Sequence, residues 1–165
     1  MHKILLSLAL ATFCVAVTAQ DLTTTKQAEK AGVRQCLSQI KELGQFVIKE
    51  SRHASHDIWS TKSVDARPFS SFVVKGYSDG DSHVTLVAGP DKTGKCYGEW
   101  RETAYWPKSC TVVREEIFGK LKFSGTLSDS TIFLTNTEET LSVYLTPQSV
   151  SAGCLTTRRE VIYYP

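Results

Sequence analysis

The stretch SFVVKGYSDGDSHVTLVA, residues 71–88, decides the fold, because it predicts an antiparallel β-hairpin near the middle of the chain. The runs Ser71–Ser78 and Ser82–Ala88 show strand periodicity on either side of Asp79-Gly80. That dipeptide suits the positive φ angles of a type I′ turn. A hairpin at this position predicts a sheet built from strands that neighbour one another in sequence.

The two faces of this hairpin differ in composition. A two-residue turn predicts that Ser78 pairs with Asp81 and Tyr77 with Ser82. One face then carries Phe72, Val74, His83, Thr85 and Val87, and the other carries Val73, Tyr77, Val84 and Leu86. Because both faces have bulky side chains, we expect the hairpin to be central in the sheet or covered on both sides.

Five more segments follow the hairpin. Pro107 ends a third strand over Lys95–Trp106, and Ser109 can cap a short helix over Cys110–Phe118, with Val113 and Ile117 facing inward. Three further strands are predicted at Thr131–Asn136, Leu141–Thr146 and Leu155–Tyr164. The short connections between neighbouring strands favour an antiparallel sheet.

Before the hairpin, residues 24–52 read as one long amphipathic helix. Thr24 and Gln27 match a capping box. Apolar or small side chains recur at helical spacing, at Val33, Cys36, Leu37, Ile40, Gly44 and Val47. The predicted fold class is therefore α+β: a long N-terminal helix packed on an antiparallel sheet of about six strands, with a short helix inserted after the third strand.

The N-terminus predicts a secretory signal peptide over residues 1–19. A short positive region precedes the apolar run from Ile4 to Val17, and the small residues before Ala19 suit signal peptidase. The apolar run is too short to cross a membrane. Residues 20–165 are then expected to form a single α+β domain, which is periplasmic or secreted.

Charge excludes one class of partner. The 19 basic and 17 acidic residues are interleaved along the chain, and the net charge is near +1 once Lys3 is removed with the signal. A nucleic-acid-binding protein needs a basic stripe. We therefore expect no nucleic-acid partner, and no later segment is apolar enough to span a membrane.

Four cysteines remain after the signal: Cys36, Cys96, Cys110 and Cys154. Their wide spacing differs from the close pairs of zinc sites, so two disulfides are expected in an exported chain. A continuous strand from Cys96 to Trp106 would carry Cys96 far from Cys110. The pairing Cys36–Cys96 with Cys110–Cys154 is preferred, although spacing leaves the connectivity open.

The segment ESRHASHDIWS, residues 50–60, raises the question of a metal site. His53 and His56 are three apart and Asp57 follows, a set that on a helix could converge on one ion. The alternative is the end of the long helix, where cationic side chains are favoured. We prefer the helix end, and expect no cofactor and no catalytic residue.

The third strand indicates a binding surface. Its residues alternate, with Tyr97, Glu99, Arg101 and Tyr105 on one face and Trp100 on the other. Tyr and Arg concentrate binding energy at protein interfaces. Arg158 and Arg159 on the last strand could extend the patch. The alternative is an ordinary strand with cross-strand charge pairs.

The run GKCYGEW…YWPKSC…AGCLTTRREVIYY resembles small exported proteins of Gram-negative bacteria of the periplasmic inhibitor or immunity type. The resemblance implies a protein that neutralises another protein, such as an effector, a toxin or a cell-wall hydrolase. The alternatives are a small metal-dependent hydrolase centred on His53, His56 and Asp57, and a structural or carrier protein of the envelope. Oligomeric state and partner identity do not follow from the sequence.

Overall fold

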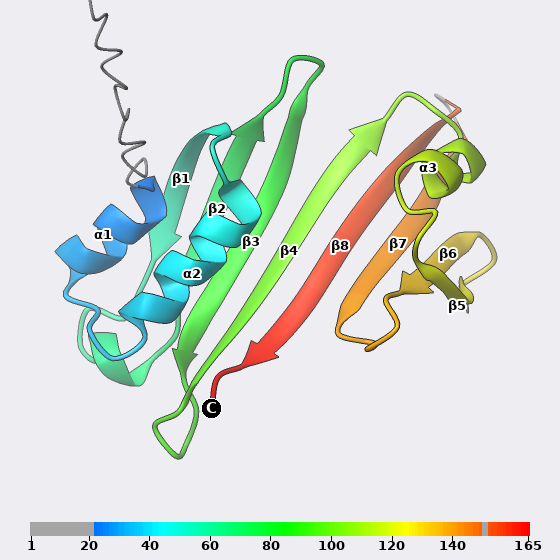
Figure 1. The fold of residues 1–165 in the computed structure, drawn as a ribbon. Coiled ribbons are helices and arrows are strands. Elements are labelled where there is room, and N and C mark those ends of the chain that lie inside the picture. Colours follow the sequence, from blue (N-terminus) through cyan, green and yellow to red (C-terminus); the bar gives the residue numbers. More distant parts are fainter. Residues whose placement is uncertain (1–21, 150–151) are drawn as a thin grey trace, which may run out of the picture.

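The computed structural model describes residues 22–149 and 152–165 (Figure 1). The predicted signal peptide, residues 1–19, lies outside these ranges and stays a prediction, as does a single domain over residues 20–165. Within the described ranges, no helix has the length and apolar character needed to cross a membrane.

Eight strands form one antiparallel sheet in the order β1-β2-β3-β4-β8-β7-β6-β5. Their bounds are β1 Arg52–Ile58, β2 Phe69–Gly76, β3 Asp81–Pro90, β4 Cys96–Trp106, β5 Lys122–Leu127, β6 Thr131–Thr135, β7 Leu141–Gln148 and β8 Gly153–Tyr163. The sheet thus consists of two meanders of consecutive strands. They are joined where β4 pairs with β8, from Tyr97 opposite Tyr163 to Trp106 opposite Cys154.

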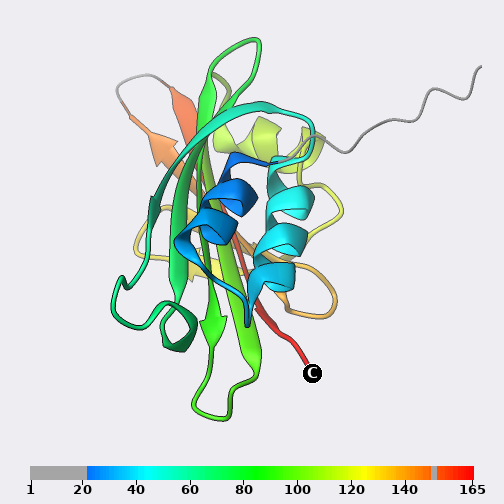
Figure 2. The ribbon, with the colours of Figure 1, turned by 90° about the vertical axis from the view of Figure 1, so that its left-hand side faces the viewer.

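The helices lie on one side of this sheet (Figures 1 and 2). They are α1 Thr23–Ala31, α2 Leu37–Ile48 and α3 Cys110–Glu116, with a short 3-10 helix at Val64–Ala66. The pair α1 and α2 covers β1 to β4, and α3 lies over β7 and β8. Ser109 caps α3 as predicted, because its side chain accepts a hydrogen bond from the backbone N–H of Val112.

The prediction of one long N-terminal helix over residues 24–52 was wrong. Gly32 has a φ of +90° and ends α1, and its backbone N–H bonds back to the carbonyls of Ala28 and Glu29. Glycine takes this left-handed conformation without steric cost, so it commonly stops a helix. A second helix, α2, then starts at Leu37, and residues 52–58 form β1.

The sheet also has more strands than the six predicted. All the predicted strands are present within a few residues, but β1 and β5 were not expected. The pairing of the β2–β3 hairpin is shifted by two residues, since Gly76 pairs with Asp81 and the N–H of Tyr77 donates to the carbonyl of Gly80 at 2.8 Å. A two-residue shift leaves each side chain on its predicted face.

We call the uncovered side of the sheet the open face. Cross-strand neighbours share a face, so its middle row runs across the strands through His56, Phe72, Thr85, Arg101 and Arg159. The hairpin lies inside the sheet, as its second and third strands, rather than at its centre. It is also not covered on both sides, because the side of Val73 and Val84 is buried whereas Phe72 is 42% exposed. Figure 2 shows the described helices on the other side only.

Two cores lie on the helix side, and the smaller one contains Cys110 and Cys154. The larger core packs α1 and α2 on β2 to β4, with Leu43, Ile48, Val73, Val84 and Trp100 among its buried members. The smaller core joins α3 to β6, β7 and β8. Of the four cysteines in the described ranges, Cys36, Cys110 and Cys154 are buried and Cys96 is half-buried.

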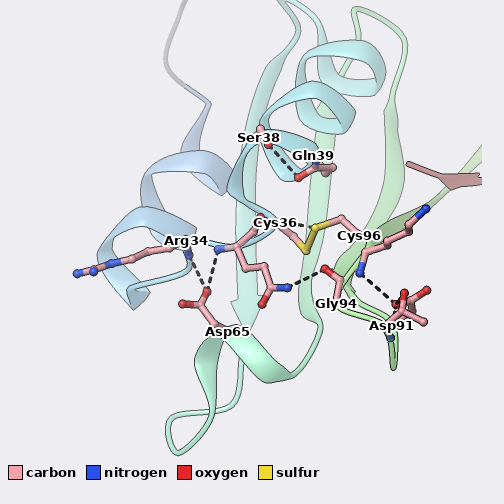
Figure 3. Close-up of a disulfide and its surroundings, with 11 residues drawn as sticks. Arg34, Cys36, Ser38, Gln39, Asp65, Asp91, Gly94 and Cys96 are labelled. Carbon is pink, nitrogen blue, oxygen red and sulfur yellow. Dashed lines mark hydrogen bonds between the residues drawn. A yellow bond between two sulfur atoms is a disulfide. The ribbon is translucent and has the colours of Figure 1, made fainter. Parts of the chain in front are cut away.

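The preferred disulfide pairing is confirmed, as Cys36–Cys96 and Cys110–Cys154. The first joins the start of α2 to the start of β4 (Figure 3). Nearby, the carboxylate of Asp65 accepts hydrogen bonds from the backbone N–H groups of Arg34, at 2.7 Å, and Gln35, at 3.1 Å. These bonds lower the pKa of Asp65 below its ordinary value.

Candidate functional site

The open face brings together five of the six predicted binding residues. Tyr97, Glu99, Arg101 and Tyr105 alternate along β4, and Arg159 on β8 lies directly opposite Arg101. Strand alternation is the reason, because successive side chains point to opposite faces of a sheet. We call these five residues the open-face patch.

Glu99 holds the two arginines of the patch together. Its Oε1 atom accepts from Nε of Arg159 at 2.9 Å and from Nη2 of Arg101 at 3.4 Å. Two guanidinium groups share one carboxylate, so the patch has one positive charge in excess. The Arg101 side chain is 52% exposed, which leaves most of its donors accessible.

Exposed apolar side chains surround the patch on the same face. Ile58 and Phe72 lie at the β1 and β2 end, and Leu155 and Tyr163 lie on β8 beside Tyr105 and Tyr97. An uncovered sheet face with several large apolar side chains is typical of an interaction surface. The structure thus gathers the predicted patch and adds apolar residues that the sequence analysis did not single out.

Arg158, the sixth predicted residue, lies on the opposite side of the sheet. It pairs across the strands with Glu102, and both side chains face the helix side. It therefore does not extend the open-face patch. It lines a second feature, a groove of about 500 Å³ between the two cores.

The floor of this groove is formed by β4 and β8, and its walls are the β2–β3 turn and the end of α3. The floor carries Glu102, Ala104, Trp106, Thr156 and Arg158. Tyr77 and Asp79 to Ser82 form the turn wall, and Ile117 and Phe118 form the opposite wall. Helices α2 and α3 lie over different parts of the sheet (Figure 1), and the residues that line the groove include none from α2.

A buried charge network forms one end of the groove. The Glu102 side chain is 3% exposed, and its Oε1 accepts from Nζ of Lys75 at 2.9 Å, from the hydroxyl of Ser82 at 2.8 Å and from that of Tyr77 at 3.1 Å. Its Oε2 contacts the Arg158 guanidinium. Lys75 is also buried and donates to the carbonyl of Val47, near the end of α2, at 2.8 Å.

These contacts set the ionisation of Glu102. Burial alone would raise the pKa of this carboxyl, but the charge of Arg158 and the hydrogen bonds from Lys75, Arg158 and Ser82 outweigh it and lower the pKa to about 2. Glu102 is therefore ionised at neutral pH. The network stays charged, with two cations around one carboxylate.

We expect the stability that Glu102 provides to be lost in acid. Its folded-state pKa lies below the ordinary value of 4.5, so its contribution is complete above about pH 4.5 and declines as the pH falls towards about 2. Denaturant unfolding of the wild type and of Glu102→Gln, from pH 7 to pH 2.5, measures the contribution of Glu102 to the free energy of unfolding. The gap in free energy of unfolding between the two proteins should narrow over this range. A gap that is constant with pH would contradict the assignment.

The histidine segment is a strand rather than a helix end. His53 and Asp57 point to the helix side and His56 to the open face, because they alternate along β1. His53 Nδ1 contacts the carbonyl of Ser51 at 2.9 Å, and Nε2 lies 3.4 Å from Thr23. The helix-end interpretation was therefore wrong, and the two histidines do not converge on one ion. In the described ranges, no group of three or more His, Cys, Asp or Glu side chains is placed to hold a metal ion.

Comparison of the chain with protein-family models, curated proteins and solved structures found no match. The resemblance to periplasmic inhibitors and immunity proteins therefore stays a prediction from the residues that carry it.

Proposed function

We propose that the protein is an exported binding protein that neutralises another protein by contact through its open face. The observation that carries the proposal is an eight-stranded sheet with helices on one side and an arginine- and tyrosine-bearing surface on the other. The two disulfides fit a protein that folds in an oxidising compartment, such as the periplasm.

Charge supports one class of partner. The open-face patch has an excess positive charge, and interfaces generally match such a patch with carboxylates on the partner. Enzymes that cleave glycosidic bonds, including cell-wall hydrolases, carry a pair of carboxylates in the active site. A cell-wall hydrolase is therefore the partner class that we favour over a toxin of unspecified charge.

The metal-dependent hydrolase considered from the sequence gains no support from the geometry. Its three residues alternate along β1, which directs His56 away from His53 and Asp57. The groove on the helix side of the sheet would suit the carrier alternative.

The expected result of replacing both Arg101 and Tyr105 by alanine is weaker binding without unfolding. The tagged mature protein should retain one stoichiometric partner from the exported proteins of its own source, and the purified partner should lose its enzymatic activity when the protein is added. The double variant should bind this partner about thirtyfold or more weakly, because interface hot spots contribute at least ~2 kcal/mol.

A matched control removes a cation and an aromatic ring elsewhere. Arg114 lies over the ring of Phe123, outside the open-face patch, so replacing both by alanine should leave the affinity unchanged. Unchanged affinity in the Arg101 and Tyr105 variant would exclude the open-face patch. Failure to retain any partner at several salt concentrations would overturn the proposed function.

A further inference from the structure

The groove between the two cores has the size of a small-molecule site. Its volume of about 500 Å³ lies inside the range of ~300–1,000 Å³ that such sites occupy. Its floor is the helix side of β4 and β8, and Tyr105 is the member of the open-face patch that also contributes to its lining. Its two ends differ in chemistry, and this difference indicates the ligand.

One end of the groove is apolar. Ala104 and Trp106 of β4 form its floor, and Ile117 and Phe118 at the end of α3 form its wall. Ile117 was predicted to face inward, yet it is 48% exposed. An exposed isoleucine beside a half-buried tryptophan provides apolar surface that a ligand would remove from water.

The other end presents a cation that is held in place. The Arg158 guanidinium contacts Glu102 and lies over the ring of Trp100 at 5.8 Å, and its side chain is 40% exposed. A guanidinium has five N–H donors. Among the described residues, Glu102 is the acceptor found for Arg158, so the guanidinium keeps donors for a ligand.

The charges favour an anionic head group. The Glu102 carboxylate accepts hydrogen bonds from four side chains, those of Lys75, Tyr77, Ser82 and Arg158. Of the two cations among them, Lys75 is buried. Two cations and one carboxylate leave an excess positive charge, and Arg158 is the cation of this network that reaches solvent. Asp79 in the turn and Asp81 at the start of β3 also line the groove, but both are exposed to solvent, where charge interactions are weak.

We propose that this groove binds a small amphiphilic carboxylate. The ligand carboxylate pairs with the guanidinium of Arg158, and the apolar body lies along Trp106, Ile117 and Phe118. Guanidinium and carboxylate match in shape as well as in charge, which favours a carboxylate over a neutral polar head. This activity is additional to protein binding through the open face.

Three ligands with the same chain and different heads test the proposal: octanoate, 1-octanol and octylammonium. Binding to the mature protein is followed by tryptophan fluorescence, because Trp106 lines the groove, and by calorimetry. We expect octanoate to bind with one molecule per chain. Octanol should bind about tenfold more weakly because it lacks the charged hydrogen bond, and octylammonium should bind more weakly still.

The variants Arg158→Gln and Arg159→Gln form a matched pair. They change adjacent residues of β8 that face opposite sides of the sheet. The first should abolish the preference for octanoate over octanol, and the second should leave both affinities unchanged. Ala104→Phe fills the groove while keeping Arg158, so it should abolish binding of all three ligands even if Arg158→Gln fails to fold.

Several results would overturn the proposal. One is the absence of octanoate binding at millimolar concentration. A second is an equal change in octanoate affinity in Arg158→Gln and Arg159→Gln. A third is tighter binding of octylammonium than of octanoate, which would mean that the charges of Asp79 and Asp81 outweigh that of Arg158. Retained octanoate binding in Ala104→Phe would place the ligand elsewhere on the protein.

Discussion

Replacing Glu102 by alanine is expected to lower the free energy of unfolding by about 3–5 kcal/mol, measured by denaturant unfolding at pH 7. The physical reason is the position of Lys75, whose side chain is 5% exposed and which pairs with Glu102 at 2.9 Å. Without the carboxylate, this ammonium group stays buried, and among the described residues the carbonyl of Val47 is its one remaining hydrogen-bond acceptor. The hydroxyl groups of Tyr77 and Ser82 lose an acceptor as well.

Two further variants show whether the loss arises from the buried charge. Glu99→Ala removes a carboxylate that also contacts two cations, but its side chain is 29% exposed, so it should cost no more than about 1 kcal/mol. Replacing the pair together, as Lys75→Met with Glu102→Leu, should recover most of the loss, because no unpaired buried charge remains. Equal losses for Glu99→Ala and Glu102→Ala would contradict this explanation.

Replacing Cys110 and Cys154 together by alanine is the second change with a large expected effect. The disulfide joins residues 44 apart in sequence, and the chain-entropy relation for a loop of this length gives about 4 kcal/mol. The core that it stabilises is the smaller of the two. We therefore expect the variant to lose structure first in α3, β5, β6 and β7.

Hydrogen exchange of backbone amides measures this local effect. In the Cys110 and Cys154 variant, the amides of β5 to β7 should exchange faster while those of β2 and β3 stay protected. The Cys36–Cys96 disulfide joins residues 60 apart in sequence. Replacing these two cysteines by alanine should instead speed exchange in α2 and at its contacts with β3 and β4. If both variants exposed the same amides, the two cores would not open independently.

Much of the sheet could be predicted from the sequence, because its strands have clear local signals. The hairpin around Asp79-Gly80 has alternating side chains, and β4 ends at Pro107 as expected. The alternation of side chains along β4 also placed Tyr97, Glu99, Arg101 and Tyr105 on one face. These are period-two patterns that depend only on neighbouring residues, so they persist in the folded protein.

The N-terminal part could not be predicted in the same way. Ile40, Gly44 and Val47 of the predicted stripe are buried in α2, whereas its buried residues Leu43 and Ile48 were not part of that stripe. A helical stripe does not show where a helix is interrupted, and Gly32 was the signal that marked the break. In β1 the usual arrangement of buried apolar and exposed polar side chains is inverted. His53, Ser55 and Asp57 face the helices while Ile58 faces solvent, so hydrophobic periodicity gives no strand signal.

The charge network was missed because its parts are far apart in sequence. Glu102 lies on the same face of β4 as Trp100, and Lys75 on the same face of β2 as Val73. A charged residue on an apolar strand face requires a buried partner. The pattern could therefore have indicated two buried charges, but only the three-dimensional pairing shows that they meet.

The place of β8 in the sheet has a consequence for the order in which the protein folds. The strand nearest the end of the sequence lies between β4 and β7, so it holds the two meanders together. Strands β1 to β4 can pair as the chain emerges, since each contacts its neighbour in sequence. The two halves can associate only after residues 153–163 have been synthesised. Until then, the long β4 strand has an unpaired edge that exposes it to aggregation, a risk that a chaperone able to hold the unfinished chain would reduce.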